Sequence, residues 1–467
     1  MLFSSITFLY AFLPVTLLVY FAVPKRYLAG RNYVLLIVSA IFYAWGGPGY
    51  LIIMTAQIIG AWLFGLAIEY WAHSPKRRLI FVLSLCFSLS MLLFYKYTDF
   101  FIGNLNAVFG SHLPLLKLVL PVGISFYTFQ ILSYLIDLYR QEIPVQRNLG
   151  LFATYVALFP PLIAGPIIRY ADISAALTNR EHSLEDFAVG AKRFVVGLGK
   201  KVIIANTMGN LVATLGGENH SSSLAAWVFI VAFALQIYFD FSAYSDMAIG
   251  LGRIFGFKFK ENFNYPYIAR SITEFWRRWH MSLSSWFRDY VYFPLGGSRV
   301  SAGRLCLNLI IVWGLTGFWH GAAWNFITWG CYFAVLLMVE KFFLKGILER
   351  VPDWLARCYT LLVVLISWVL FDARSMGGAL DTLGVLFGAG GIGADSAAWY
   401  YLRSYAVPLL LAIVGSTPLP AMAGKWLAER FPKLAAVAEP IFLAGLLLIC
   451  TAFLVDSSFN PFIYFRF

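Results

Sequence analysis

Long apolar runs restrict the fold of this chain more than any other feature of its sequence. They recur from residue 5 to residue 455, and each is about 17 to 25 residues long, the length of helix that crosses the hydrocarbon core of a bilayer. No stretch between them is long enough for a sizeable soluble domain. Only 12% of the residues are charged, against about a quarter in soluble domains. We therefore predict an all-α, polytopic membrane protein with a single domain, 1–467.

The apolar runs predict ten spanning helices and an eleventh, residues 32–45, that is shorter and either tilted or partial. The ten are 5–23, 50–68, 79–95, 113–138, 225–250, 305–324, 327–344, 356–370, 405–423 and 441–455. Residues 1–23 have neither a basic start nor a small-residue cleavage site, so we expect them to remain as the first span. Lys and Arg cluster at 25–31 and 76–78. Because such clusters stay in the cytoplasm, the N-terminus is predicted to lie outside.

Two stretches do not fit simple helical hairpins. In 159–166, three prolines and a glycine interrupt an apolar run, so that run cannot be one straight helix. Irregular backbone at membrane depth survives only inside protein or beside a cavity. Residues 149–168 are therefore predicted to form a broken or re-entrant element, with a turn between two interfacial helices as the alternative. Residues 253–304 hold nine basic and three acidic residues and are predicted to be a cytoplasmic segment.

The charge balance and the cysteines exclude several kinds of site. The chain has 35 Lys+Arg against 23 Asp+Glu, a net charge of +12, and in a membrane protein such an excess contacts lipid headgroups. Membrane lipid is thus an expected partner, and nucleic acid is not. The five cysteines are scattered, without a C-x-x-C pair or a histidine at ligand spacing. We expect neither a disulfide framework nor a metal site.

His320 is the strongest candidate for chemistry. It lies in 314–325, inside an apolar stretch with no charged residue between Arg304 and Glu340. An ionisable group at membrane depth is costly unless it faces a cavity or a partner, so it is a functional candidate by default. Burial would keep its imidazole in the neutral form that a general base needs. The alternative is a core histidine that is hydrogen-bonded to a neighbouring helix.

His280 belongs to 272–290, which is predicted to be one interfacial amphipathic helix. At about 100° per residue, its aromatic residues and His280 share one face, and its arginines share the other. Glu274 and Arg278 stand four apart and add local support. His280 is either functional or a structural histidine bonded to a backbone carbonyl. Arg277 and Arg278 suit a phosphate-bearing donor such as coenzyme A, and equally suit lipid headgroups.

Other ionisable residues are given structural roles. Asp240 and Asp246 point in different directions on a helix, so we expect hydrogen-bonded packing or pairing with cytoplasmic arginines rather than paired-carboxylate catalysis. Lys200 and Lys201 are predicted to reach the cytoplasmic interface. Four histidines in hydrophilic loops or beside turn residues are expected to be solvated. They are His73, His112, His182 and His220.

Several segments together resemble one known family. They are 123–130, 238–248, 272–290, 290–299 and 314–325, with 3–5 and 460–465 at the two ends. In these segments the chain resembles the membrane-bound O-acyltransferase family, and within it the bacterial alginate O-acetyltransferase branch. The resemblance covers essentially the whole chain.

The resemblance implies a fold and a site. The fold would be a bundle of about eleven spanning helices plus re-entrant and interfacial helices around a central tunnel, in the inner membrane of a bacterium. His320 would be the catalytic histidine in the middle of the tunnel, and His280 would line its cytoplasmic mouth as a second site residue. Arg277, Arg278 and Trp279 are the predicted contacts to the donor.

The resemblance also implies a reaction. An acetyl group would pass from a cytoplasmic thioester, acetyl-CoA, to a hydroxyl on the outer side, and no permanently bound cofactor is expected. In this branch the acceptor is commonly a serine of a periplasmic or extracellular SGNH-type partner, which then acetylates an exopolysaccharide. Phe333 and Asn206 stand where relatives often have a histidine and an acid, so the polymer itself is left open.

Other functions stay in competition. The same scaffold serves O-acetylation of peptidoglycan or cellulose and D-alanylation of teichoic acids, although 294–297 looks more like the acetyltransferase branches. A polysaccharide exporter or flippase, from a different class, would be expected to show duplicated halves, and we find no internal repeat. A non-enzymatic scaffold for a cell-envelope complex predicts that His320→Ala leaves activity intact.

Overall fold

The computed structural model describes residues 1–216 and 220–456, and every regular element in that part of the chain is a helix. The helices form two compact units. Unit 1 consists of Met1–Phe194 and Met247–Lys260, and unit 2 consists of Val195–Asp246 and Glu261–Phe467. The boundary falls inside two helices, α9 (Leu184–Gly199) and α11 (Ser223–Ile254). The single domain expected from the sequence stays a prediction.

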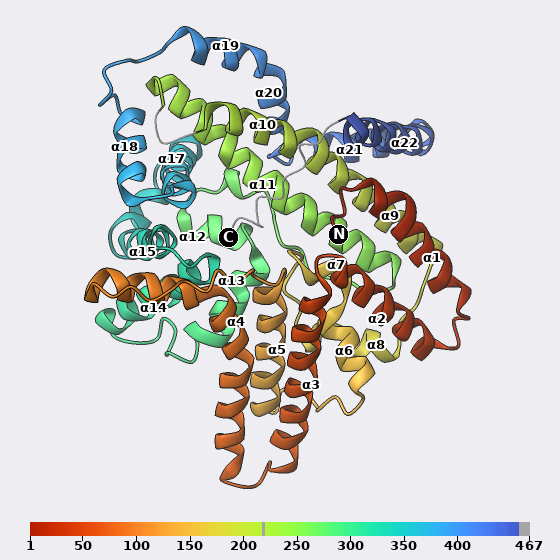
Figure 1. Ribbon diagram of the computed structural model, residues 1–467. Helices are drawn as coiled ribbons and strands as arrows, with labels where there is room; N and C mark the ends of the chain where they lie inside the picture. The colour runs from red at the N-terminus through yellow and green to blue at the C-terminus, as the bar shows by residue number, and fades with distance from the viewer. Residues whose placement is uncertain (217–219, 457–467) are drawn as a thin grey trace. The chain divides into compact units, whose positions relative to one another are not determined.

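Unit 1 is built around a helical hairpin. Its helices before α9 are η1 (Phe8–Phe12), α1 (Leu13–Ala22), α2 (Leu28–Ala44), α3 (Pro48–Tyr70), α4 (Lys76–Phe109), α5 (Ile124–Tyr139), α6 (Leu149–Ala157), α7 (Phe159–Leu162) and α8 (Tyr170–Thr178). Helices α3, α4 and α5 lie side by side (Figure 1). The α3–α4 turn contains Ser74 and Pro75, and the N–H of Arg77 bonds back to Ser74 to close it.

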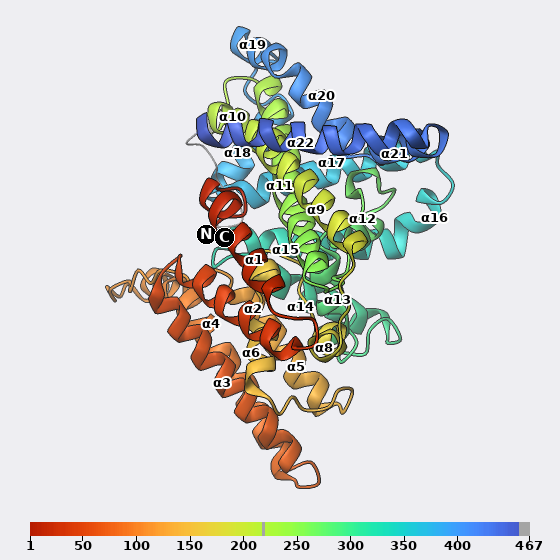
Figure 2. The ribbon, with the colours of Figure 1, turned by 90° about the vertical axis from the view of Figure 1, so that its right-hand side faces the viewer.

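Unit 2 carries both histidine segments. Its elements after α9 are η2 (Lys200–Ala205), α10 (Asn206–Leu215), α11, η3 (Pro266–Ile268), α12 (Ile272–Arg278), α13 (Met281–Phe287), η4 (Arg288–Tyr292), α14 (Ala302–His320), α15 (Trp324–Val339), η5 (Glu340–Leu344), α16 (Lys345–Leu348), α17 (Asp353–Asp372), α18 (Met376–Leu386), α19 (Ser396–Ser404), α20 (Ala406–Gly415), α21 (Leu419–Arg430) and α22 (Pro432–Asp456). Helices α21 and α22 lie side by side at the end of the described chain (Figure 2).

The structure confirms the predicted class, an all-helical multi-pass membrane protein, but not the number of spans. Among the described residues, six helices are long and apolar enough to cross a membrane, or seven if the bent pair α19–α20 is one span. Three further apolar helices are shorter: Phe8–Ala22, Leu28–Ala44 and Met376–Leu386. The predicted count of about eleven is therefore not confirmed. The orientation, the tunnel and the re-entrant path stay predictions.

Several helix boundaries differ from the predictions because of proline and glycine. The predicted span 113–138 starts too early: residues 111–121 are not helical, and α5 begins only after Pro121 and Gly123. Apolar composition favoured a span there, but proline disfavours helix at its own position and at the residue before it. The predicted break within 149–168 is confirmed, since α6 ends at Ala157 and α7 is a single buried turn. Residues 460–465 lie outside the described residues.

The close contact between α14 and α15 depends on two glycines. A Cβ atom at Gly317 would lie 2.2 Å from the carbonyl oxygen of Phe326, and one at Gly330 would lie 2.2 Å from that of Trp313. The two backbones therefore touch directly, which only glycine allows. This contact lies one turn before the end of α14, where His320 stands.

We expect Gly317→Ala to push α14 and α15 apart and to cost about 1–3 kcal/mol, as overpacking does in other cores. The heat-induced loss of monodisperse protein in detergent measures this effect. Gly314→Ala is the matched control, because nothing lies within 4 Å of a Cβ at that position on the same helix. Equal melting of the two variants would contradict the proposed backbone contact.

Candidate active site

His320 is the last residue of α14, and it lies in an aromatic cluster. Its side chain is 7% exposed. Its ring centroid is 5.0 Å from that of Trp319, 5.1 Å from Trp329 on α15 and 5.4 Å from Phe371 on α17. Helix α14 ends here because Gly321, the next residue, adopts an extended conformation. The break in the predicted span 305–324 thus places His320 at a helix end, where its backbone carbonyl has no intrahelical partner.

His280 lies between α12 and α13, and the structure corrects the prediction of one helix over 272–290. Helix α12 ends at Trp279, whose backbone is extended. The backbone of His280 is left-handed, with φ of 42°, so α13 starts in a new direction. A side-chain periodicity cannot reveal such a break. The Glu274–Arg278 pair predicted on this segment is present, at 2.8 Å.

The aromatic ring of Trp319 connects the two histidines. His280 is 1% exposed, and its ring centroid is 6.0 Å from that of Trp319, which in turn packs on His320. Phe241 of α11 packs edge-on against His280 at 4.6 Å. Burial, and to a smaller extent the nearby His320, hold the pKa of His280 well below its usual range. Both histidines therefore belong to one buried cluster, and His280 is neutral at physiological pH.

Asn262 holds His280, and the sequence analysis missed it. Its Oδ1 lies 3.1 Å from His280 Nδ1 and also accepts from the backbone N–H of Ser282 at 3.1 Å. Its Nδ2 donates to Ser245 Oγ on α11 at 3.0 Å. Because an amide oxygen only accepts, His280 Nδ1 must carry the proton, which leaves Nε2 as the basic nitrogen. An asparagine in a polar loop carries no sequence signal for this role.

We expect Asn262→Asp to raise the pKa of His280, because a carboxylate that accepts from Nδ1 stabilises the imidazolium. If the reaction needs neutral His280, the acidic limb of the pH–kcat/KM profile then moves to higher pH. Asn264→Asp is the control: it adds the same charge in the same loop at an exposed position. Profiles that coincide for the two variants and wild type would contradict the role of Asn262.

The three predicted donor contacts do not lie together. Arg278 binds Glu274 and donates to the Asn264 carbonyl. Trp279 is 3% exposed and packs against the aromatic rings of Phe275 and Trp368. Arg277 is exposed and lines a groove. Their role in donor binding stays a prediction, and of the three only Arg277 presents its charge to open space.

The aspartates of α11 are paired with lysines rather than with arginines. Asp240 and Lys201 form an ion pair of 2.7 Å, with side chains 1% and 3% exposed, and Asp246 and Lys200 form a second pair of 2.7 Å. The prediction that Lys201 reaches the interface is wrong, because its partner lies inside the unit. Asp240 precedes Phe241, the residue that packs against His280, so this buried pair holds α11 at the site.

Asn325 and Phe333 also have structural partners. The side-chain amide of Asn325 donates to the carbonyls of Phe371 and Ala373, and so holds the C-terminal end of α17 in place. Phe333 is fully buried and packs against Trp329 at 5.2 Å, where relatives of the alginate branch were expected to have a histidine. Its ring completes the aromatic wall behind His320.

The four histidines expected to be solvated divide into two groups. His73 and His112 are exposed, as predicted. His220 is partly buried against Phe229. The prediction that His182 is solvated is wrong, because it hydrogen-bonds Tyr20 Oη at 2.7 Å and Arg31 at 3.2 Å. Burial first, and then the charges of Arg31 and Arg180, lower its pKa to about 4.

The fold and the site define a multi-pass membrane protein whose two buried histidines share an aromatic cluster. The sequence profile of the membrane-bound O-acyltransferase family matches residues 140–371, a range that contains both histidines. The chain belongs to this family and is an acyltransferase.

Three relatives of known name show which branch of the family the chain is similar to. The chain is 42% identical over 383 residues to "Probable alginate O-acetylase AlgI" of Pseudomonas aeruginosa, which covers 80% of this chain and 73% of the relative. It is 35% identical over 427 residues to the peptidoglycan O-acetyltransferase of Helicobacter pylori, covering 84% and 81%. A teichoic acid D-alanyltransferase of Bacillus subtilis is 29% identical, covering 74% and 88%. The predicted family and branch are thereby confirmed.

Proposed function

We propose that this protein moves an acetyl group from a cytoplasmic thioester, acetyl-CoA, across the bacterial inner membrane to a hydroxyl acceptor, for O-acetylation of an exopolysaccharide of alginate type. The observation that carries the proposal is the pair of buried histidines on one aromatic cluster, in a chain 42% identical to a probable alginate O-acetylase. The acceptor is proposed to be an SGNH-type protein outside the membrane.

The chemistry follows from the properties of the groups. His320, as a neutral base, takes the proton of the acceptor hydroxyl while the hydroxyl oxygen attacks the thioester carbonyl. The tetrahedral intermediate collapses, the carbon–sulfur bond breaks, and the thiolate takes the proton from the His320 imidazolium. The aromatic walls exclude water, which would otherwise hydrolyse the thioester. His280, held by Asn262, presents a basic Nε2 in the same cluster and is the second proposed catalytic residue.

The test is transfer or hydrolysis of radiolabelled acetyl-CoA by the purified full-length protein, together with the candidate acceptor. Wild type is compared with His320→Ala and His280→Ala. Label transfer that depends on His320 supports the proposal. If wild type neither binds nor consumes acetyl-CoA with the acceptor present, the proposal fails in favour of another donor or of transport.

A second candidate polymer is peptidoglycan. The 35% identity to a peptidoglycan O-acetyltransferase over 84% of the chain favours it, and so does the departure of Phe333 from the pattern expected of the alginate branch. Incubation with each polymer and its acceptor protein, followed by release of acetate with mild base, separates the two.

A further inference from the structure

A groove of about 690 Å³ lies in unit 2, and neither His280 nor His320 lines it. Helix α12, the start of α14 and the helical run from α15 through η5 to α16 line it. One wall is apolar, with Leu305 and Leu309 on α14 and Leu337 on α15. Leu309 precedes His320 by eleven residues of one helix, which is about 16 Å along its axis. The apolar wall of the groove is therefore about three turns of α14 away from His320, whereas Arg277 lies three residues before His280.

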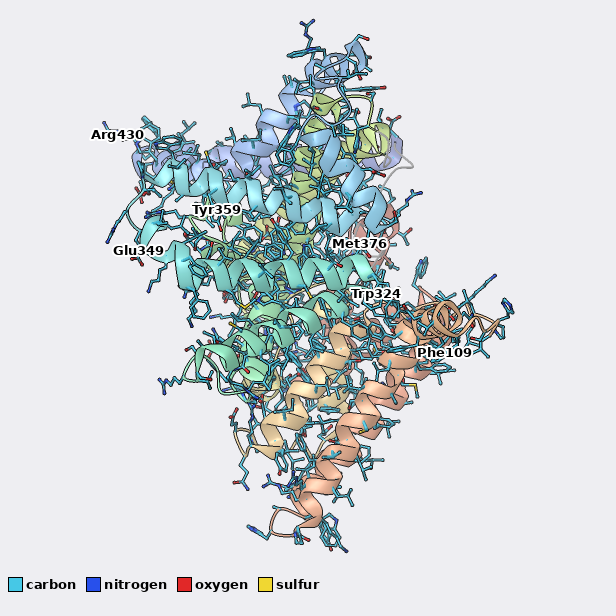
Figure 3. The ribbon with its side chains drawn as sticks, turned by 90° about the vertical axis from the view of Figure 1, so that its left-hand side faces the viewer. Phe109, Trp324, Glu349, Tyr359, Met376 and Arg430 are labelled. Carbon is cyan, nitrogen blue, oxygen red and sulfur yellow. The ribbon has the colours of Figure 1, made fainter. Side chains whose placement is uncertain are left out.

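The lining of the groove changes from apolar to cationic along one face of the helical run from α15 to α16. Leu337, Lys341 and Lys345 follow one another at intervals of four residues and all line the groove, so they share one helix face. From Leu337 to Lys345 this face passes from apolar to cationic over about 12 Å. In Figure 3, Trp324 and Glu349 mark the two ends of this helical run.

Two of the acidic residues in the groove are already committed to other partners. Glu340 accepts from the backbone N–H groups of Ile272 and Thr273 at the start of α12, at 2.5 Å and 3.0 Å. Glu274 accepts from Arg278 and from the N–H of Arg270. The charge of Glu274 is thus offset by Arg278. The N–H groups at the start of α12 hold the Glu340 carboxylate in place without cancelling its charge.

Three cationic side chains of the groove have no partner among the described residues. Arg277, Lys341 and Lys345 make no hydrogen bond or ion pair with the residues that the structure describes, and all three are exposed. With Arg270, which pairs with Asp353, the lining holds four cations, against the three acids Glu274, Glu340 and Glu349, so the groove has a small excess of positive charge. Such a group complements a phosphate anion.

We propose that this groove binds an anionic glycerophospholipid, with its phosphate on Arg277, Lys341 and Lys345 and its first methylene groups against Leu305, Leu309 and Leu337. Helix α14 is a candidate span, so its leucines lie where acyl chains are available. A soluble anion would gain nothing from that apolar wall, whereas a phospholipid uses both walls. The inference does not depend on the proposed acetyl transfer.

The test uses full-length protein in nanodiscs of phosphatidylglycerol and phosphatidylethanolamine, and counts retained lipids by native mass spectrometry. We expect wild type to retain phosphatidylglycerol and Lys341→Gln/Lys345→Gln to bind it roughly thirty-fold more weakly, from the usual contribution of each cation near anionic lipid. The matched control is Lys425→Gln/Lys433→Gln, two exposed lysines of α21 and α22 in the same unit, which should behave as wild type.

Several results would overturn the proposal. Equal retention in the groove variant and the control would show that the groove lysines hold no lipid. Retention of phosphatidylethanolamine as strongly as phosphatidylglycerol would remove the role of charge. Displacement of the lipid by inorganic phosphate would indicate a free-anion site, and displacement by acetyl-CoA would assign the groove to the acyl donor. Acetyl transfer is measured separately, so failure of the proposed function leaves this result unaffected.

Discussion

Acetyl transfer should fall by about 100-fold to 10,000-fold in His320→Ala, the range that loss of a positioned general base produces. The imidazole is buried between the rings of Trp319, Trp329 and Phe371, so water has little room to replace it. Affinity for acetyl-CoA should change little, because a base acts on the acceptor hydroxyl and not on the donor. The measurement is initial rate with saturating label, alongside equilibrium binding of acetyl-CoA.

The control for His320→Ala is His220→Ala, which removes a partly buried histidine in the same unit that packs on Phe229. It should keep normal transfer. Monodisperse elution of both variants separates loss of chemistry from loss of fold. A His320→Ala protein that is folded and keeps more than about a tenth of the activity would rule out His320 as the base.

Lys201→Met should destabilise unit 2 by about 3–5 kcal/mol, because it leaves the carboxylate of Asp240 buried without its cation. The pair is 2.7 Å long, and both side chains are almost fully buried. Asp240 lies within the apolar helix α11, and an uncompensated charge is most costly in such surroundings. The loss of monodisperse protein on heating in detergent, read against wild type, measures the effect.

Two further variants test the physical cause. Lys200→Met breaks the neighbouring pair with Asp246, whose side chains are 27% and 17% exposed, so water compensates and the cost should be smaller. Lys201→Met/Asp240→Leu removes both charges and should recover much of the lost stability. If the double variant melts no higher than Lys201→Met, uncompensated charge is not the cause of the loss.

Local sequence patterns were sufficient for the class of protein, and they singled out two histidines that the structure brings into one buried cluster. Apolar runs of spanning length identify a membrane protein without any knowledge of tertiary contacts, because each helix satisfies its own backbone in the bilayer. His320 stood out for the same reason: an ionisable residue in a long uncharged stretch is visible in one dimension. The break at residues 149–168 followed from its prolines.

The helix break at His280 could not be predicted, although its residues were singled out. The aromatic periodicity of 272–290 continues through the break, so the pattern indicated one helix. Helix α12 ends at Trp279, whose backbone is extended, and the left-handed His280 that follows is held from outside the segment. Its ring Nδ1 donates to Asn262 Oδ1, and the N–H of Met281 donates to the Asn262 carbonyl. Backbone conformation at one residue has no periodic signature.

The amino-acid sequence by itself determined that the chain crosses a membrane as helices and that two histidines are candidates for its chemistry, because hydropathy and charge act on each segment separately. Only the tertiary structure decided which groups meet: Lys201 with Asp240, Asn262 with His280, and Trp319 between the histidines. A buried hydrogen bond or ion pair depends on the distance between two backbones. That distance is set by packing, such as the contact of Gly317 with α15, and not by either segment alone.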